Sequence, residues 1–206
     1  MPVSQDFKDR IFKNLNKISD HYQTPFHIYD EKGIRDTCKN LKKAFSEINS
    51  FQEFYAVKAN PNPEILKIMK DEGFGFDCSS VPELILSREL TKNPDDIMFT
   101  SNNTTLEEFE TAFADSGCIM NLDDISLIDK LPEMPELISF RYNPGPERTG
   151  NAIIGNPSEA KYGLTTDQII PAYKKAKELG ADRIINPKDE DLEKIIKEKT
   201  ILLWKK

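Results

Sequence analysis

Long apolar runs are missing from this 206-residue sequence, and histidine, cysteine and tryptophan are scarce. No segment approaches the ~18 consecutive apolar residues of a membrane span, and the first residues lack the apolar core of a signal peptide. Cys38, Cys78 and Cys118 are odd in number and irregularly spaced, which argues against a disulfide framework and against a cysteine metal site. These absences predict a cytoplasmic protein with reduced thiols, without membrane contact and without a bound metal.

Basic residues are also fewer than acidic ones, 28 against 35, which gives a net charge of −7. A surface of this sign does not attract nucleic acids or anionic membranes, so neither is expected as a partner. The two histidines, His21 and His27, both lie near the N-terminus and are expected to be surface or packing residues. The length suits one domain with a substantial core.

Strand and helix patterns alternate along most of the chain. Apolar stretches predict strands at residues 26–29, 54–57, 75–80, 97–100, 118–122 and 138–143. Amphipathic segments lie before and between them, beginning with a helix over about 5–22. Residues suited to begin the later helices are Asp30, Asn62 with Pro63, Ser80 with Glu83, Thr105 with Glu108, Asp124, and Thr165 with Gln168. Successive βα units with short connections indicate a parallel sheet.

One strand–turn–helix unit, residues 53–73, carries the feature most relevant to chemistry. Lys58 closes the apolar run 54–57 just before Asn62 and Pro63 begin a helix. Active sites of α/β proteins lie at the carboxyl ends of the strands. A lysine there is either a solvated strand-end residue, which spacing alone favours, or a desolvated amine that forms a Schiff base with a carbonyl compound.

A family resemblance favours the second interpretation of Lys58. The sequence Tyr-Ala-Val-Lys-Ala-Asn at 55–60 resembles the pyridoxal-phosphate lysine motif of the barrel-type amino-acid decarboxylases, and most closely that of the diaminopimelate decarboxylases. Further similar segments are TPFHIYDEKGI at 24–34, GFDCSSVPEL at 75–84, an N-x-D at 121–123, FRYNPG at 140–145 and KYGL at 161–164. Together they cover roughly residues 24–183. The resemblance implies an α/β fold, a TIM-like (β/α) barrel that binds pyridoxal 5′-phosphate.

The resemblance also implies roles for three residues. Lys58 would be catalytic and would carry the cofactor as a Schiff base. Asp77, at the end of its strand, would line the cofactor pocket; the alternative is a capping or turn carboxylate. Arg141, on the polar face of the strand 138–143, would bind an anionic group of cofactor or substrate. Its alternative is a structural salt bridge to a neighbouring carboxylate such as Asp77.

The implied activity is decarboxylation of a small amino acid, with meso-diaminopimelate giving L-lysine and CO₂ as the favoured reaction. Ornithine, arginine and carboxynorspermidine remain alternative substrates. Two further alternatives are a non-catalytic pyridoxal-phosphate-binding barrel and an inactive fragment.

Beyond residue 183 the resemblance stops. The family continues with a histidine that stacks on the cofactor ring, a glycine-rich phosphate loop, a glutamate at the ring nitrogen, and a β-domain with a catalytic cysteine and tyrosine. Here no histidine follows His27, no cysteine follows Cys118, and the last glycine is Gly180. We therefore expect residues 1–183 to form the N-terminal part of the barrel, with a divergent tail at 184–206. The barrel would be incomplete, without the C-terminal β-domain, and little active unless a homodimer completes the site.

Overall fold

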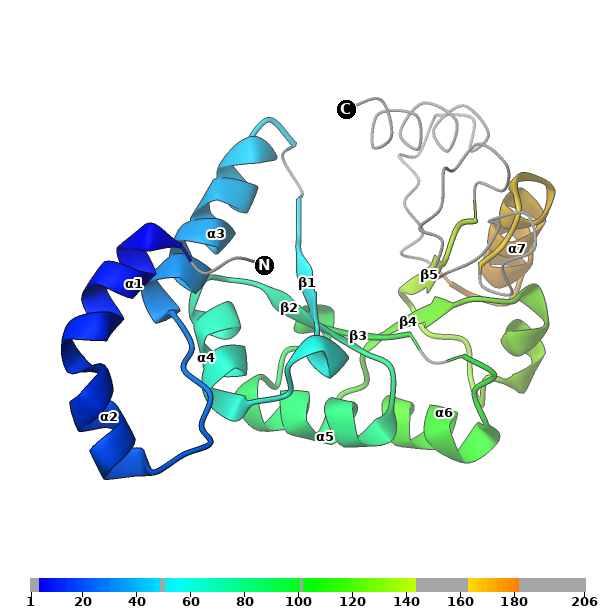
Figure 1. Ribbon diagram of the computed structural model, residues 1–206. Coiled ribbons are helices and arrows are strands. Elements are labelled where there is room, and N and C mark those ends of the chain that lie inside the picture. The colour runs from blue at the N-terminus through cyan, green and yellow to red at the C-terminus, as the bar shows by residue number, and fades with distance from the viewer. Residues whose placement is uncertain (1–3, 49–50, 101, 144–162, 182–206) are drawn as a thin grey trace.

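The computed structural model of the protein describes residues 4–48, 51–100, 102–143 and 163–181. Its centre is a five-stranded parallel sheet whose spatial order, β1-β2-β3-β4-β5, follows the sequence (Figure 1). The strands are β1 (Phe54–Ala56), β2 (Gly75–Cys78), β3 (Ile97–Phe99), β4 (Ile119–Leu122) and β5 (Ile138–Phe140). An isolated parallel bridge from Tyr142 to Leu164 follows β5. The expected α/β class with a parallel sheet is confirmed, and within the described residues the sheet remains open between β1 and β5.

Helical segments connect the strands. They are the 3₁₀ turn η2 (Val57–Ala59) with α4 (Pro63–Asp71), α5 (Val81–Leu90) with η3 (Pro94–Asp96), α6 (Leu106–Phe113), and the 3₁₀ helix η4 (Ile125–Lys130); α7 (Thr166–Glu178) follows β5. Figure 1 shows α4, α5 and α6 lying side by side along one face of the sheet. A parallel pair needs such a crossover, and crossovers of one hand place their helices on one face.

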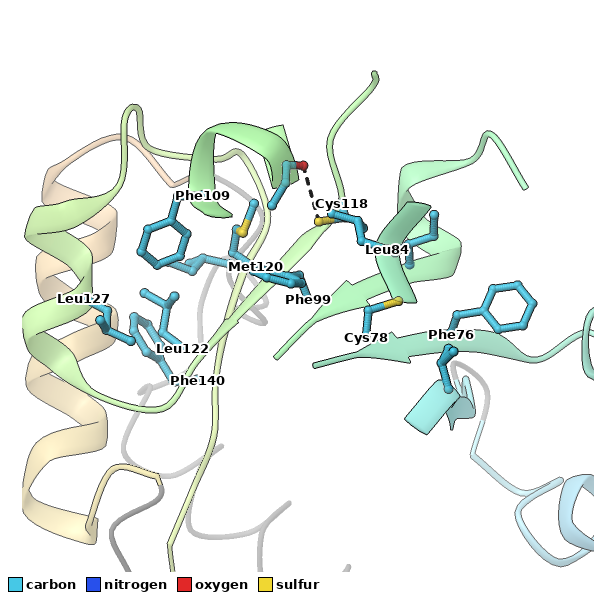
Figure 2. Packing of buried hydrophobic residues seen from close by; sticks show 14 of the residues in the cluster. Phe76, Cys78, Leu84, Phe99, Phe109, Cys118, Met120, Leu122, Leu127 and Phe140 are labelled. Atoms are coloured by element: carbon cyan, nitrogen blue, oxygen red, sulfur yellow. Dashed lines mark hydrogen bonds between the residues drawn. The ribbon is translucent and has the colours of Figure 1, made fainter. Parts of the chain in front are cut away.

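The core lies between the sheet and these helices. Strand side chains alternate, and those that belong to the core cluster are Phe76, Cys78, Ile97, Phe99, Met120, Leu122, Ile138 and Phe140. Figure 2 shows Phe99, Met120 and Phe109 of α6 packed together, with Leu122, Leu127 and Phe140 beside them. Each fully buried large apolar side chain contributes roughly 1.5–3 kcal/mol, so this layer fixes the position of the strands. The alternate positions, among them Asp77, Met98, Asn121 and Ser139, are only half-buried.

The capping residues largely perform as predicted. Asn62 accepts from the Glu64 N–H at 2.9 Å and Asp124 from the Ser126 N–H at 2.7 Å. Ser80 is different, because its side chain makes no cap bond to the helix. Instead, the Glu83 carboxylate accepts from the Ser79 N–H and from the Ser80 hydroxyl, at 3.0 and 2.8 Å. Through these two hydrogen bonds, Glu83 stabilises the turn between β2 and α5.

The Thr105→Ala substitution is expected to destabilise the protein by about 1 kcal/mol. Thr105 Oγ1 accepts from the Glu108 N–H, and the Glu108 carboxylate accepts from the Thr105 N–H at 2.9 Å, which completes the predicted capping box of α6. Urea unfolding would measure the change. Thr105→Ser keeps the acceptor and should restore most of the stability; equal losses in both variants would contradict the capping explanation.

The N-terminal segment departs from the prediction of one helix over 5–22. It forms α1 (Gln5–Ile11) and α2 (Leu15–Tyr22), joined by the 3₁₀ turn η1 (Phe12–Asn14), and none of the three buries a residue. Asp30 occupies the N-cap position of α3 (Glu31–Ala44), but its carboxylate accepts from Arg10 instead of capping the helix. The Arg10 guanidinium lowers the pKa of Asp30 through this contact. Ion pairs join the segment to the start of α3, from Arg10 to Asp30 and from Asp6 to Lys32, while its apolar side chains Phe7, Ile11 and Ile18 are half-buried.

Residues 26–29, predicted as a strand, form no strand in the structure. Phe26 and Ile28 are half-buried and alternate with exposed His27 and Tyr29, so the pattern of a strand is present. What is missing is a neighbouring strand among the described residues, and a strand needs a partner for its backbone groups. The predicted tail 184–206 lies outside the described residues.

The three cysteines are free and buried. Burial raises the pKa of Cys78 and of Cys118 to about 12, which keeps both thiols protonated and unreactive at neutral pH. Among the described residues no helix is both long and apolar enough to cross a membrane, and no three acidic, cysteine or histidine side chains gather as a metal site.

Candidate functional site

Lys58 lies directly beyond the carboxyl end of β1. The turn η2 buries its neighbour Val57 completely and leaves Lys58 exposed. The Lys58 Nζ donates a hydrogen bond to the Ser79 hydroxyl at 3.1 Å, and Ser79 itself follows β2. The amine therefore lies at the edge of the sheet where α/β proteins bind their ligands.

Asp77 lies within β2, with its side chain half-buried on the face opposite the helices. The Thr100 hydroxyl donates to Asp77 Oδ1 at 2.7 Å, and the Asn121 amide donates to Thr100 Oγ1 at 3.1 Å. This hydrogen-bonded row crosses three neighbouring strands and fixes the orientation of the carboxylate. Asp77 therefore serves neither as a helix cap nor as a turn residue, the alternative that the sequence left open.

Arg141 follows β5, at the opposite edge of the sheet from Lys58. Its side chain is exposed, and its backbone continues the sheet through bonds to Leu122 and Leu164. Burial raises the pKa of Asp123, while the charge of Arg141 acts in the opposite direction on that carboxyl. None of the ion pairs of the described residues joins Arg141 to Asp77, the carboxylate named in the alternative interpretation.

The sequence did not identify Ser79, Thr100 and Asn121 as site residues, although Ser79 and Asn121 lie in segments that resemble the family. All three lie at or just after the carboxyl end of a strand, and all three hydrogen-bond to or beside a predicted site residue. Their position was a usable signal, because polar residues that end consecutive parallel strands meet at one edge of the sheet.

The donor set of this edge fits pyridoxal 5′-phosphate. The cofactor presents an aldehyde and ring substituents that form hydrogen bonds. Lys58 supplies an exposed primary amine for the aldehyde, and the row from Asp77 to Asn121 supplies a carboxylate, a hydroxyl and an amide. Among the described residues, this amine and this hydrogen-bonded row thus suit the part of the cofactor that carries the aldehyde and the ring.

The fold and the site together define a class of protein in which successive βα units form a parallel sheet and a lysine amine lies at the carboxyl end of the first strand. A family model described as "Pyridoxal-dependent decarboxylase, pyridoxal binding domain" matches residues 31–182. The chain belongs to this family of pyridoxal-phosphate-dependent decarboxylases.

Curated relatives support the assignment. Protein TabA of Pseudomonas amygdali pv. tabaci is 38% identical over 183 residues, which cover 89% of this chain and 43% of that protein. The diaminopimelate decarboxylase of Methanothermobacter thermautotrophicus is 36% identical over 174 residues, 82% of this chain and 40% of the relative. The chain thus spans well under half the length of either relative.

Solved structures support the fold. Diaminopimelate decarboxylase from Helicobacter pylori, complexed with L-lysine, superimposes with a TM-score of 0.70 at 24% identity, over 81% of this chain and 44% of that one. The arginine decarboxylase of Paramecium bursaria Chlorella virus gives a TM-score of 0.66 at 21% identity, over 82% and 45% of the two chains. The described sheet therefore shares the fold of these structures, which agrees with the α/β class expected from the sequence.

Proposed function

We propose that this chain forms the cofactor-binding part of an amino-acid decarboxylase, with meso-diaminopimelate converted to L-lysine and CO₂. The observation that carries the proposal is the exposed amine of Lys58 at the carboxyl end of β1. The substrate is inferred from the diaminopimelate decarboxylases among the relatives at 36 and 34% identity. Ornithine, arginine and carboxynorspermidine are the substrates to test beside it.

Each proposed site residue has a distinct task. Lys58 would hold the cofactor through its Nζ, and Asp77, oriented by Thr100, would hydrogen-bond beside it. Arg141 would attract an anionic group of the cofactor or substrate from the far edge of the sheet. When bound, the cofactor would supply an electron sink for the carbanion left by loss of CO₂.

Catalysis is proposed for a homodimer in which a second copy contributes to the site, with the single chain limited mainly to cofactor binding. Because the chain spans 43 and 40% of its relatives' lengths, turnover by the chain alone is expected to be low. A cytoplasmic location is part of the proposal, since three free, buried thiols suit a reducing compartment.

Borohydride trapping tests the proposed attachment. The protein is incubated with pyridoxal phosphate, reduced, digested and mapped by mass spectrometry, and one labelled peptide containing Lys58 is expected. Lys67 is an internal control, since its exposed amine pairs with Glu64 at 2.7 Å. Label spread over the surface lysines, or absent, would refute the assignment of Lys58.

Release of CO₂ then separates an enzyme from a binding protein. Labelled diaminopimelate is added to the loaded protein, and ornithine and arginine are assayed in parallel. Cofactor held on Lys58 without CO₂ release from any of these substrates would favour the non-catalytic pyridoxal-phosphate-binding barrel.

A further inference from the structure

The contact between Lys58 and Ser79 joins two successive βα units. Ser79 is held through its backbone, because its N–H donates to the Glu83 carboxylate at 3.0 Å and Glu83 lies in the first turn of α5. Lys58 reaches it from the β1 side through a flexible four-carbon side chain. Of the two groups, Ser79 is the fixed one, so it determines where the amine lies.

The side-chain hydrogen bond of Lys58 goes to a hydroxyl, without an ion pair among the described residues. Lys70 also donates to a hydroxyl, that of Thr91 at 2.9 Å, but it pairs with a carboxylate as well. Lys67 pairs with Glu64 and Lys70 with Asp96, both at 2.7 Å, and Lys175 pairs with Asp129. A carboxylate favours the charged ammonium form, which cannot attack an aldehyde. A hydroxyl both accepts from an amine and donates to it, so it can position the nitrogen in either protonation state.

We propose that Ser79 is a positioning residue for Lys58: its hydroxyl holds Nζ in the orientation from which it attacks the aldehyde of pyridoxal phosphate. This inference rests on the proposed function, since it takes Lys58 as the site of attachment. In the step that it promotes, a C=N bond forms between Nζ and the aldehyde carbon. The aldehyde oxygen leaves as water with two hydrogens from the amine, so no further reactant is needed.

Three substitutions of Ser79 test the proposal through the rate of cofactor attachment, followed by visible absorbance and localised by borohydride trapping. Ser79→Thr retains the hydroxyl and should react within about twofold of wild type. Ser79→Ala should be about fivefold slower, as expected from one hydrogen bond of ~1 kcal/mol. Ser79→Asp should be slowest, by about tenfold or more, because a carboxylate would hold the amine as a charged ion pair.

The neighbouring Ser80 gives a matched control, because its hydroxyl donates to Glu83, whereas the hydrogen bond of Lys58 goes to Ser79. Ser80→Ala should attach the cofactor at the wild-type rate, and urea unfolding checks that each variant is folded. Equal rates for wild type, Ser79→Ala and Ser79→Asp would overturn the positioning role. A near-wild-type attachment rate in Ser79→Thr together with a slower rate in Ser79→Ala would support the role. A general disturbance of the turn would not depend on whether residue 79 carries a hydroxyl.

A reagent that needs no cofactor separates this inference from the proposed function. Competitive acetylation with acetic anhydride, quantified at Lys58 relative to Lys67, should give the same order of variants. If pyridoxal phosphate never attaches to wild type, the proposed function fails, and the order in acetylation then shows only that Ser79 governs the reactivity of the Lys58 amine. If attachment to Lys58 proceeds equally in all variants, the function stands and the role of Ser79 is refuted.

Discussion

A Lys58→Ala chain is expected to remain folded and to lose all stable attachment of pyridoxal phosphate. Lys58 is exposed, and its hydrogen bond to Ser79 is a single surface contact, so stability should change by no more than about 0.5 kcal/mol. Cofactor retention, in contrast, depends on the covalent bond proposed for the Lys58 amine. The measurement is the visible absorption band after dialysis, which should be present in wild type and absent from the variant.

Lys67→Ala is the matched control for this loss. It removes another exposed lysine, in the helix that follows, and should leave the band unchanged. A band of wild-type intensity in Lys58→Ala would place the cofactor elsewhere and refute the proposed site. Weak absorbance lost on dialysis from both variants and from wild type would show only reversible binding, and would equally contradict attachment at Lys58.

Replacing Arg88 with methionine is expected to destabilise the protein by about 2–4 kcal/mol. Arg88 lies in α5 and is buried, and its guanidinium donates to the carbonyls of Thr111, Ala112 and Ala114 at 2.8–2.9 Å. These carbonyls end α6, where helix geometry leaves carbonyls without intrahelical partners and the helix dipole is negative. Two of them have a second donor, the Cys118 thiol for Ala112 at 3.5 Å and the Gly117 N–H for Ala114 at 3.0 Å. Methionine preserves most of the packing but removes every donor. Each of the three carbonyls would then lose a charged donor, that of Ala112 in a buried position.

Urea unfolding of Arg88→Met measures this effect. Glu89→Ala, at the exposed neighbouring position, should change stability by less than about 0.5 kcal/mol. Arg88→Lys retains the charge without the forked donor geometry and should recover only part of the loss. A methionine variant as stable as wild type would show that the three hydrogen bonds contribute nothing net.

Most of the fold could be predicted from the sequence because its determinants are local. Asn62 with Pro63, and Thr105 with Glu108, mark helix starts through contacts within a few residues. The predictions that differ from the structure concern features that depend on a partner far away in the sequence. Residues 26–29 have a strand pattern, but a strand requires a neighbour. Asp30 lies at the predicted N-cap of α3, while its carboxylate accepts from the distant Arg10. The 3₁₀ turn at 12–14 has no glycine or proline to reveal it.

The site was predictable only in part. Lys58 could be found from its place at a strand end and from its motif, but its contact with Ser79 depends on how β1 aligns with β2. The same is true of the hydrogen bond that Thr100 donates to Asp77, which joins neighbouring strands. The order of strands can be inferred from successive βα units, whereas their register is set by packing across the whole sheet. The roles of Lys58, Asp77 and Arg141 stay predictions that the experiments above address.

A sheet whose strand order follows the sequence also has a consequence for how the chain acquires its structure. Each strand pairs with the one synthesised just before it, so every addition closes a short loop and costs little chain entropy. The sheet can therefore grow one unit at a time during synthesis, starting from β1 and β2. The hydrogen bonds from Lys58 to Ser79, from Thr100 to Asp77 and from Asn121 to Thr100 each join adjacent units. The groups proposed to hold the cofactor would then come together in that order, as the sheet itself forms.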